Sequence, residues 1–256
     1  MDSVGQDSPF STPRIFVLRL NPIRKRDQAV ALLVEREEHL SNHEEEGGSA
    51  SLSFHYKLIS DDMSGWEKDG GEFSASYDDS FLGSPHVRIT SSTVLTGGYF
   101  VVDPGWLAGR GIGTFFMNEI VRWVKQWPEA SVMPVELLES DAHGVNKERR
   151  NRFYENFGFV FDYEDGRRVS GQSIPMKARD LIPLSDHKNQ LLQDKLECCE
   201  LGEFLSGLVR DVRILELERW GLQNQLASCD SELEAAYKFP FRWAMKTFAS
   251  KFLRGY

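Results

Sequence analysis

A glycine-rich stretch in the middle of the chain constrains the fold more than any other segment. Residues 107–124 read LAGRGIGTFFMNEIVRWV, in which three glycines surround Arg110 and a helical pattern follows at once. The preceding Gly98–Val102 is typical of a β-strand, which Asp103–Gly105 ends. A strand, a glycine loop and a helix in this order bind phosphate, because glycine lets backbone N–H groups approach an anion and the helix N-terminus adds partial positive charge.

A glycine loop before a helix also occurs as ordinary turn chemistry, and this alternative stays open at this point. The spacing differs from that of a P-loop, because no Gly-Lys-Ser/Thr follows. It also differs from the dinucleotide fingerprint, which needs a further glycine deeper in the helix.

The remaining chain up to about residue 180 alternates helical and strand patterns, which predicts a mixed α/β fold. A helix is predicted from Asp27, as its N-cap, to about His39, and a second one over Asn146–Phe157. Loops are predicted over His43–Gly48 and Asp61–Gly71, the latter as a cover for a substrate cleft. Strands are predicted over Arg14–Leu20, Leu52–Ile59, Phe73–Tyr77, Val87–Leu95, Val132–Leu138 (with Pro134 at an edge or bulge), Phe159–Tyr163 and Ser173–Lys177.

Charge and cysteine content restrict the classes of protein. The net charge of −9 argues against general nucleic-acid binding. The three cysteines form neither a disulfide framework nor a zinc spacing, so we expect no metal and a reducing cytoplasm. The polar first residues do not read as a signal peptide, and no apolar run is long enough to span a bilayer.

A second stretch, Asn146–Phe159, reads NKERRNRFYENFGF: an arginine-rich helix that stops at Gly158 before a strand. Together, the glycine loop and this stretch resemble the GNAT family of N-acetyltransferases. There, Arg/Gln-x-x-Gly-x-Gly/Ala opens the helix that receives the pyrophosphate of acetyl-CoA, and Asn…Ala-x-x-Phe-Tyr-Glu-x-x-Gly-Phe closes the fold. The resemblance covers roughly residues 14–180. This chain departs from the family pattern at Ala108, Lys147 and Arg150.

The resemblance implies an acyl-CoA N-acyltransferase fold, in which helices flank a central, mostly antiparallel sheet. It implies acetyl-CoA as co-substrate and direct attack by an amine, without an acyl-enzyme. The residues that it places around the coenzyme are Val101 and Val102 on the strand Tyr99–Val102, Gly109, Arg110, Gly111, Ile112, Gly113 and Thr114 in the loop and first helical turn, and Asn146.

The resemblance also implies that Tyr154 protonates the leaving thiolate, a task that suits a phenol. The family gives no clear general base here. Glu136, Glu139 and Asp141 follow or lie on the strand Val132–Ser140, and we select Glu139, acting through water, with His143 as the alternative. Each of them also fits an ordinary solvated charge.

The acceptor amine does not follow from these residues. An acidic domain favours a cationic amine, whether a small amine, an amino sugar or a protein amine. The departures from the family pattern leave a second function open, namely a catalytically inactive scaffold of the same fold that acts through its C-terminal tail.

The tail begins after Pro183 and divides into a helical segment, 184–237, and a basic segment, 238–256; residues 1–13 are expected to be a flexible leader before the catalytic domain, 14–183. A heptad pattern predicts a coiled coil and a homo-oligomer through 191–236, or a long helix packed on the domain. The heptad places Leu191, Cys198, Leu205, Val212, Arg219, Leu226 and Leu233 in one set and Asp194, Leu201, Leu208, Leu215, Leu222, Cys229 and Ala236 in the other.

The basic segment holds five Lys or Arg residues and no acid. As a helix it would place Phe241, Met245, Phe248 and Phe252 on one face. This pattern suits an acidic membrane surface, an acidic protein partner, or packing against the acidic domain. The expected location is therefore the cytoplasm, including the surface of a membrane.

Overall fold

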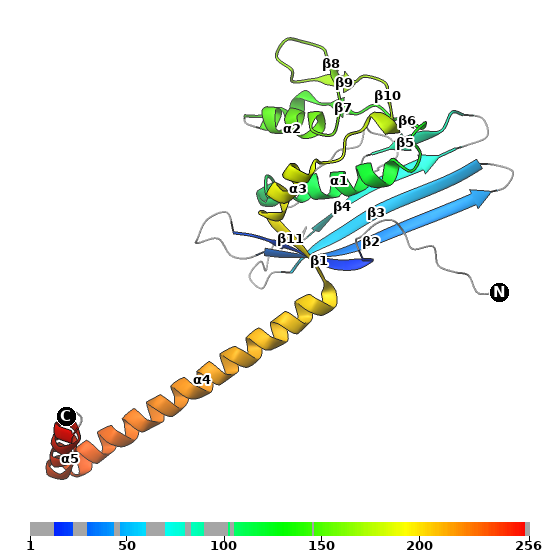
Figure 1. The fold of residues 1–256 in the computed structure, drawn as a ribbon. Coiled ribbons are helices and arrows are strands. Elements are labelled where there is room, and N and C mark those ends of the chain that lie inside the picture. Colours follow the sequence, from blue (N-terminus) through cyan, green and yellow to red (C-terminus); the bar gives the residue numbers. More distant parts are fainter. Residues whose placement is uncertain are drawn as a thin grey trace, which may run out of the picture. The chain divides into compact units, whose positions relative to one another are not determined.

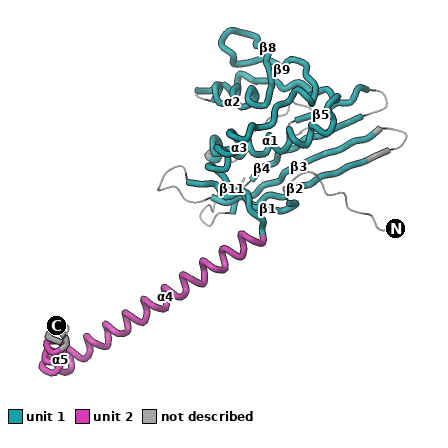
Figure 2. The backbone as a smooth tube through the Cα atoms, viewed as in Figure 1, with its two compact units in different colours: residues 1–201 teal, residues 202–256 magenta. Residues whose placement is uncertain are grey.

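The computed structural model describes residues 13–22, 30–43, 47–59, 70–79, 83–89, 102, 105–144 and 146–253. The chain forms two compact units, residues 1–201 and 202–256 (Figure 2). The first unit is a mixed α/β structure built on a large, mostly antiparallel sheet, which confirms the predicted fold class at this level (Figure 1).

The elements of the first unit follow in chain order. The strands are β1 (Ile15–Leu20), β2 (Val30–His43), β3 (Gly47–Ile59), β4 (Gly70–Asp78), β5 (His86–Arg88), β6 (Ser131–Val132), β7 (Glu136–Leu137), β8 (Phe161–Tyr163), β9 (Gly171–Ser173), β10 (Met176–Lys177) and β11 (Leu196–Glu200). The α-helices are α1 (Ile112–Val124), α2 (Asn146–Glu155) and α3 (Asp186–Gln193), and short 3-10 helices cover Gly105–Leu107, Glu139–Asp141 and Ala178–Asp180. The large sheet has the order β10-β6-β5-β4-β3-β2-β1-β11, and a small sheet has the order β7-β9-β8.

The helix predicted over 27–39 is wrong: residues from Val30 onward form the long strand β2, and Asp27 lies outside the described residues. The segment VALLVEREEHL contains good helix formers, but it pairs with β1 on one edge and with β3 on the other. Leu32 and Val34 face the core at strand spacing. Backbone pairing on both sides therefore overrides the local preference for a helix.

Other strand predictions agree in part. β1, β3 and β4 contain or closely match the predicted strands. His43, Gly47 and Gly48 extend β2 and β3 into the predicted loop, and Gly70 and Gly71 open β4. Residues 60–69 and 90–101 lie outside the described part, so the cover loop and most of the strand Gly98–Val102 do too. Val102 itself is described; it lies outside any strand and packs on the core.

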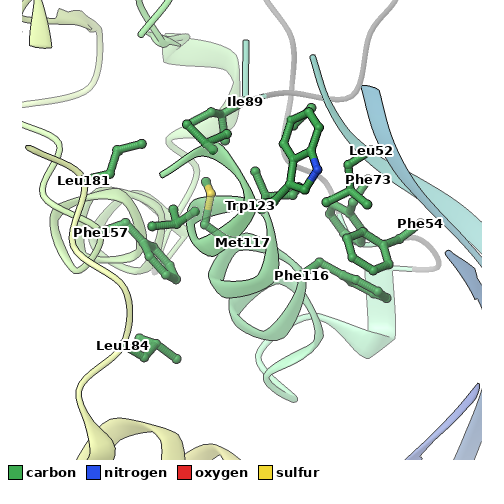
Figure 3. Packing of buried hydrophobic residues seen from close by; sticks show 14 of the residues in the cluster. Leu52, Phe54, Phe73, Ile89, Phe116, Met117, Trp123, Phe157, Leu181 and Leu184 are labelled. Atoms are coloured by element: carbon green, nitrogen blue, oxygen red, sulfur yellow. The ribbon is translucent and has the colours of Figure 1, made fainter. Parts of the chain in front are cut away.

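The core forms between α1 and one face of the large sheet (Figure 3). The ring of Phe116 lies 5.1 Å from that of Phe54 and 4.8 Å from that of Phe73, centroid to centroid. Trp123 is fully buried and donates its indole N–H to Glu38 at 2.8 Å. Aromatic packing and this hydrogen bond fix α1, and hence the glycine loop before it, against the sheet.

The two sheets are joined by one antiparallel ribbon that is interrupted in the middle. Val132 pairs with Met176 in the large sheet, and Glu136 pairs with Gln172 in the small sheet, in the same register. Pro134 and Pro175 lie in the interruption, and neither has a backbone N–H group to donate to a ladder. The strands predicted over Val132–Leu138 and Ser173–Lys177 are therefore each divided between two sheets. In the first of them the division falls at Pro134, where the sequence predicts an edge or a bulge.

The C-terminal tail departs from the predicted continuous helical segment. α3 and β11 belong to the first unit, where β11 pairs with β1, and Leu192 and Leu196 are buried in the core. The heptad positions before Leu201 are therefore wrong, because α3 ends at Gln193 and the chain continues as the strand β11, so no single helix carries them. The second unit contains α4 (Leu201–Lys238) and α5 (Pro240–Leu253). Over the described part of the chain, no helix combines the length and apolarity needed to cross a membrane.

Glu119 on α1 gives the fold a testable pH dependence. Its carboxylate is buried and lies 3.3 Å from the Arg122 guanidinium. Burial raises the pKa of Glu119, and the charges of Arg122 and Arg36 oppose that shift. Because the native state then binds this proton more tightly than the unfolded chain, Glu119 lowers stability as pH rises above the unfolded pKa of about 4.3.

We therefore expect Glu119→Gln to gain stability relative to wild type between about pH 4 and pH 7. Urea unfolding across this range measures the free energy of unfolding. Glu129→Gln, an exposed residue with the same charge change, is the matched control. Equal pH dependence of the two variants would contradict the prediction.

Candidate functional site

The glycine loop has a backbone that only glycine adopts easily. Gly109 has φ +85° and Gly111 has φ +95°, both in the left-handed region. Gly111 is the N-cap of α1, with no side chain as a cap and no acidic residue in the first turn. The first hydrogen bond of the helix runs from the N–H of Phe115 to the carbonyl of Gly111 at 2.9 Å. Within the described residues, the N–H groups of 111–114 have no protein acceptor, so this helix end can bind an anion.

Sheet topology places this loop where ligands commonly bind. β5 and β6 are parallel neighbours, and the chain between them contains α1. The N-terminus of α1 therefore lies beyond the carboxyl end of β5. In sheets with parallel strands, crevices at these ends are the usual ligand sites.

Arg110 is a buried cation inside the loop. The residue is 8% exposed, and its Nη2 donates to the carbonyl of Asn21 at 3.4 Å. Its Nε is buried, and no described residue accepts its hydrogen bond. No carboxylate of the described residues lies within ion-pair distance of Arg110. Among the described residues, the buried positive charge of Arg110 thus has no carboxylate partner.

The structure brings α2 to the glycine loop. A Cβ atom at Gly109 would lie 3.8 Å from Nη1 of Arg149. Arg149 donates to Oδ1 of Asn146 at 2.7 Å, and Asn146 donates in turn to the carbonyl of Asp141 at 2.5 Å. Asn146, predicted to contact the coenzyme, therefore accepts a hydrogen bond from an exposed arginine whose guanidinium lies beside the loop. Sequence analysis did not select Arg149; its only signal was its place in the arginine-rich second stretch.

Tyr154 lies further along α2 and is buried. It is 5% exposed, and its ring meets those of Phe159 and Phe161 edge-on, at 5.7 Å and 5.8 Å. Five residues separate it from Arg149, which is about 7.5 Å along a helix axis. Tyr154 therefore lies on the same helix as the arginine beside the loop, with its ring in the core.

Glu139 occupies a different element from the predicted one. It begins the 3-10 helix Glu139–Asp141 instead of continuing a strand, it is exposed, and its carboxylate lies 3.7 Å from Arg167. The strand ends early because the chain turns after β7 toward α2. Glu136 and His143 are also exposed.

Arg150, where the family pattern has alanine, has a structural task. Its guanidinium donates to the carbonyls of Leu138 and Val169 at 2.6 Å and 2.8 Å. It therefore connects α2 to the end of β7 and to the loop before β9. The fold explains this departure from the family pattern. The guanidinium of Arg150 donates to these two carbonyls and not to the glycine loop.

A cavity of about 380 Å³ lies elsewhere on the large sheet. Its lining is mainly polar and comes from side chains that alternate with core residues along β2, β3, β4 and β5. The charged or titratable residues of this lining include His39, Asp78, His86 and Arg88. It contains neither the glycine loop nor α2. We therefore place the candidate site at the loop, where donors, a buried cation and Arg149 converge.

Comparison of the chain with protein-family models, with curated proteins and with solved structures found no match.

Proposed function

We propose that this protein is an acetyl-CoA-dependent N-acetyltransferase of the GNAT type. The observation that carries the proposal is the end of α1. Its first N–H groups have no acceptor among the described residues, and they lie in a loop with left-handed glycines, beside the buried Arg110 and the exposed Arg149. A pyrophosphate carries two charges and many acceptor oxygens, which suit this set of donors.

Each proposed residue has a separate task in the reaction. Residues 111–114 bind the pyrophosphate through backbone N–H groups, Gly109 and Arg110 complete the loop, and Asn146 orients Arg149 toward the same anion. A primary amine attacks the thioester carbonyl, so a C–N bond forms and the C–S bond breaks. Tyr154 gives its phenolic proton to the sulfur, and the proton of the amine passes through water to Glu139. The acceptor is a small amine, an amino sugar or a protein amine.

A carboxylate in the first turn of α1 separates coenzyme binding from folding. Thr114 is half-buried in this turn, and Thr114→Glu adds a negative charge where the helix dipole favours it, by about 0.3–1 kcal/mol. The same charge repels a pyrophosphate by about 1–3 kcal/mol, which corresponds to roughly five- to 150-fold weaker binding. We expect Thr114→Glu to bind acetyl-CoA more weakly while its thermal stability is kept or raised.

Calorimetric titration with acetyl-CoA is the measurement, and Thr114→Gln, with the same shape and no charge, is the control. Weak binding by the Glu variant alone supports the coenzyme site. Failure of the folded wild-type chain to bind acetyl-CoA would overturn the proposal. It would favour the inactive scaffold, a function that the exposed apolar residues of α4 support.

A further inference from the structure

α4 presents an apolar stripe over its whole length. None of its residues is buried, and Leu215, Leu222 and Leu226 are each more than 60% exposed. Along the helix, the stripe follows alternating steps of three and four residues and comprises Leu201, Leu205, Leu208, Val212, Leu215, Leu222, Leu226 and Leu233. A sustained seven-residue repeat drifts around a straight helix unless the helix supercoils with another one. The period of the stripe therefore specifies a helical partner.

We propose that α4 pairs with α4 of a second copy of this chain as an antiparallel coiled coil. A second copy presents the same stripe with the same period and length, so the interface is self-complementary about a two-fold axis. This inference goes beyond the proposed function and does not depend on it.

The charges of α4 set the antiparallel direction. Arg219 lies within the stripe, at the position where the repeat expects an apolar residue. A parallel pair would place Arg219 against Arg219 in the core and Asp211 against Glu216 at the flank. The two arginines in one core layer oppose that direction. The flank does not decide it, because the antiparallel register described below places Asp211 near Glu232, also a like-charge contact. In an antiparallel pair, the two Arg219 side chains occupy different layers.

The bounds of α4 set the register. In an antiparallel pair, the apolar layers face each other only when one helix is shifted along the other by whole heptads. One of these alignments makes the ends of the two helices nearly coincide. In that register Arg219 lies opposite Leu222, and Val212 opposite Cys229. The remaining layers pair Leu205 with Ala236, Leu208 with Leu233, and Leu215 with Leu226. Leu205 and Val212 thus meet the smaller Ala236 and Cys229, which lets the layers interdigitate.

Cys229 makes this register testable in the full chain. The starting protein carries Cys198→Ser and Cys199→Ser, so that Cys229 is its one cysteine. We expect this protein to stay uncrosslinked after mild oxidation, because the two Cys229 side chains lie in distant layers. Adding Val212→Cys should give a covalent dimer on a non-reducing gel, since facing layers meet the geometry of a disulfide.

Two controls identify the bond. Val212→Cys combined with Cys229→Ser should not crosslink, because the two introduced cysteines lie far apart in an antiparallel pair. Ile214→Cys, outside the stripe, should crosslink poorly with Cys229 retained. Sedimentation equilibrium should give a dimer at micromolar concentration. A dimer through Cys229 alone would overturn the direction, and a monomer in sedimentation without crosslinking would overturn the pairing and show that another surface covers the stripe.

Discussion

Tyr154→Phe is expected to reduce the rate of acetyl transfer by about a hundredfold or more, while the affinity for acetyl-CoA stays unchanged. General-acid catalysis typically contributes about 10²- to 10⁴-fold to a rate, and the phenol is the group proposed to protonate the sulfur. The ring of Tyr154 is packed against Phe159 and Phe161, and phenylalanine keeps those contacts. The loss should therefore appear in turnover and not in binding.

The measurement compares steady-state turnover with calorimetric affinity for both proteins, using an amine found by screening. Tyr163→Phe is the matched control, because the hydroxyl of Tyr163 accepts a hydrogen bond from Arg168 at 2.9 Å and has no proposed part in the reaction. If Tyr154→Phe turns over at the wild-type rate, Tyr154 is not the acid, although the acetyltransferase proposal itself would stand.

Gly111→Ala is expected to destabilise the fold by about 2–5 kcal/mol. Two costs add: an L-residue in the left-handed region costs about 1–2 kcal/mol, and overpacking costs about 1–3 kcal/mol. The added Cβ would lie 2.8 Å from Cδ1 of Leu192 and 3.4 Å from Cδ2 of Leu196. Both leucines are buried, so neither can move away freely.

Gly109→Ala separates the two costs. Gly109 has a similar φ, but the nearest atom to its added Cβ is the far end of Arg149, at 3.8 Å. We expect this variant to lose only the backbone part, about 1–2 kcal/mol. Urea unfolding of both variants gives the difference. Equal losses in the free energy of unfolding would mean that α3 moves enough to accommodate the new methyl group.

Local chemistry explains what the sequence predicted well. The glycine loop and α1 follow from residues that are neighbours in the chain, since left-handed glycines and a helical apolar pattern need no distant partner. Pro134 likewise marks the point where its strand is interrupted, because a missing N–H group acts wherever the residue lies.

Tertiary contacts explain what it predicted poorly. The segment that forms β2 fits a helix by composition, and only its pairing with β1 and β3 decides the structure. Leu192 and Leu196 belong to the segment that the sequence assigns to the tail, but they pack beside Gly111 in the core. Arg149 was missed because its importance arises from the approach of α2 to the loop, which no local pattern encodes.

The ribbon that joins the two sheets has a mechanical consequence. Where Pro134 and Pro175 interrupt its pairing, two hydrogen bonds of 2.9 Å still cross the ribbon. They run from the N–H of Ser173 to the carbonyl of Val135 and from the N–H of Val135 to the hydroxyl of Ser173. Phe157 and Leu181 lie in the buried core that also contains residues of both sheets. Bending of the ribbon at this crossing therefore breaks fewer backbone hydrogen bonds than bending within a continuous ladder.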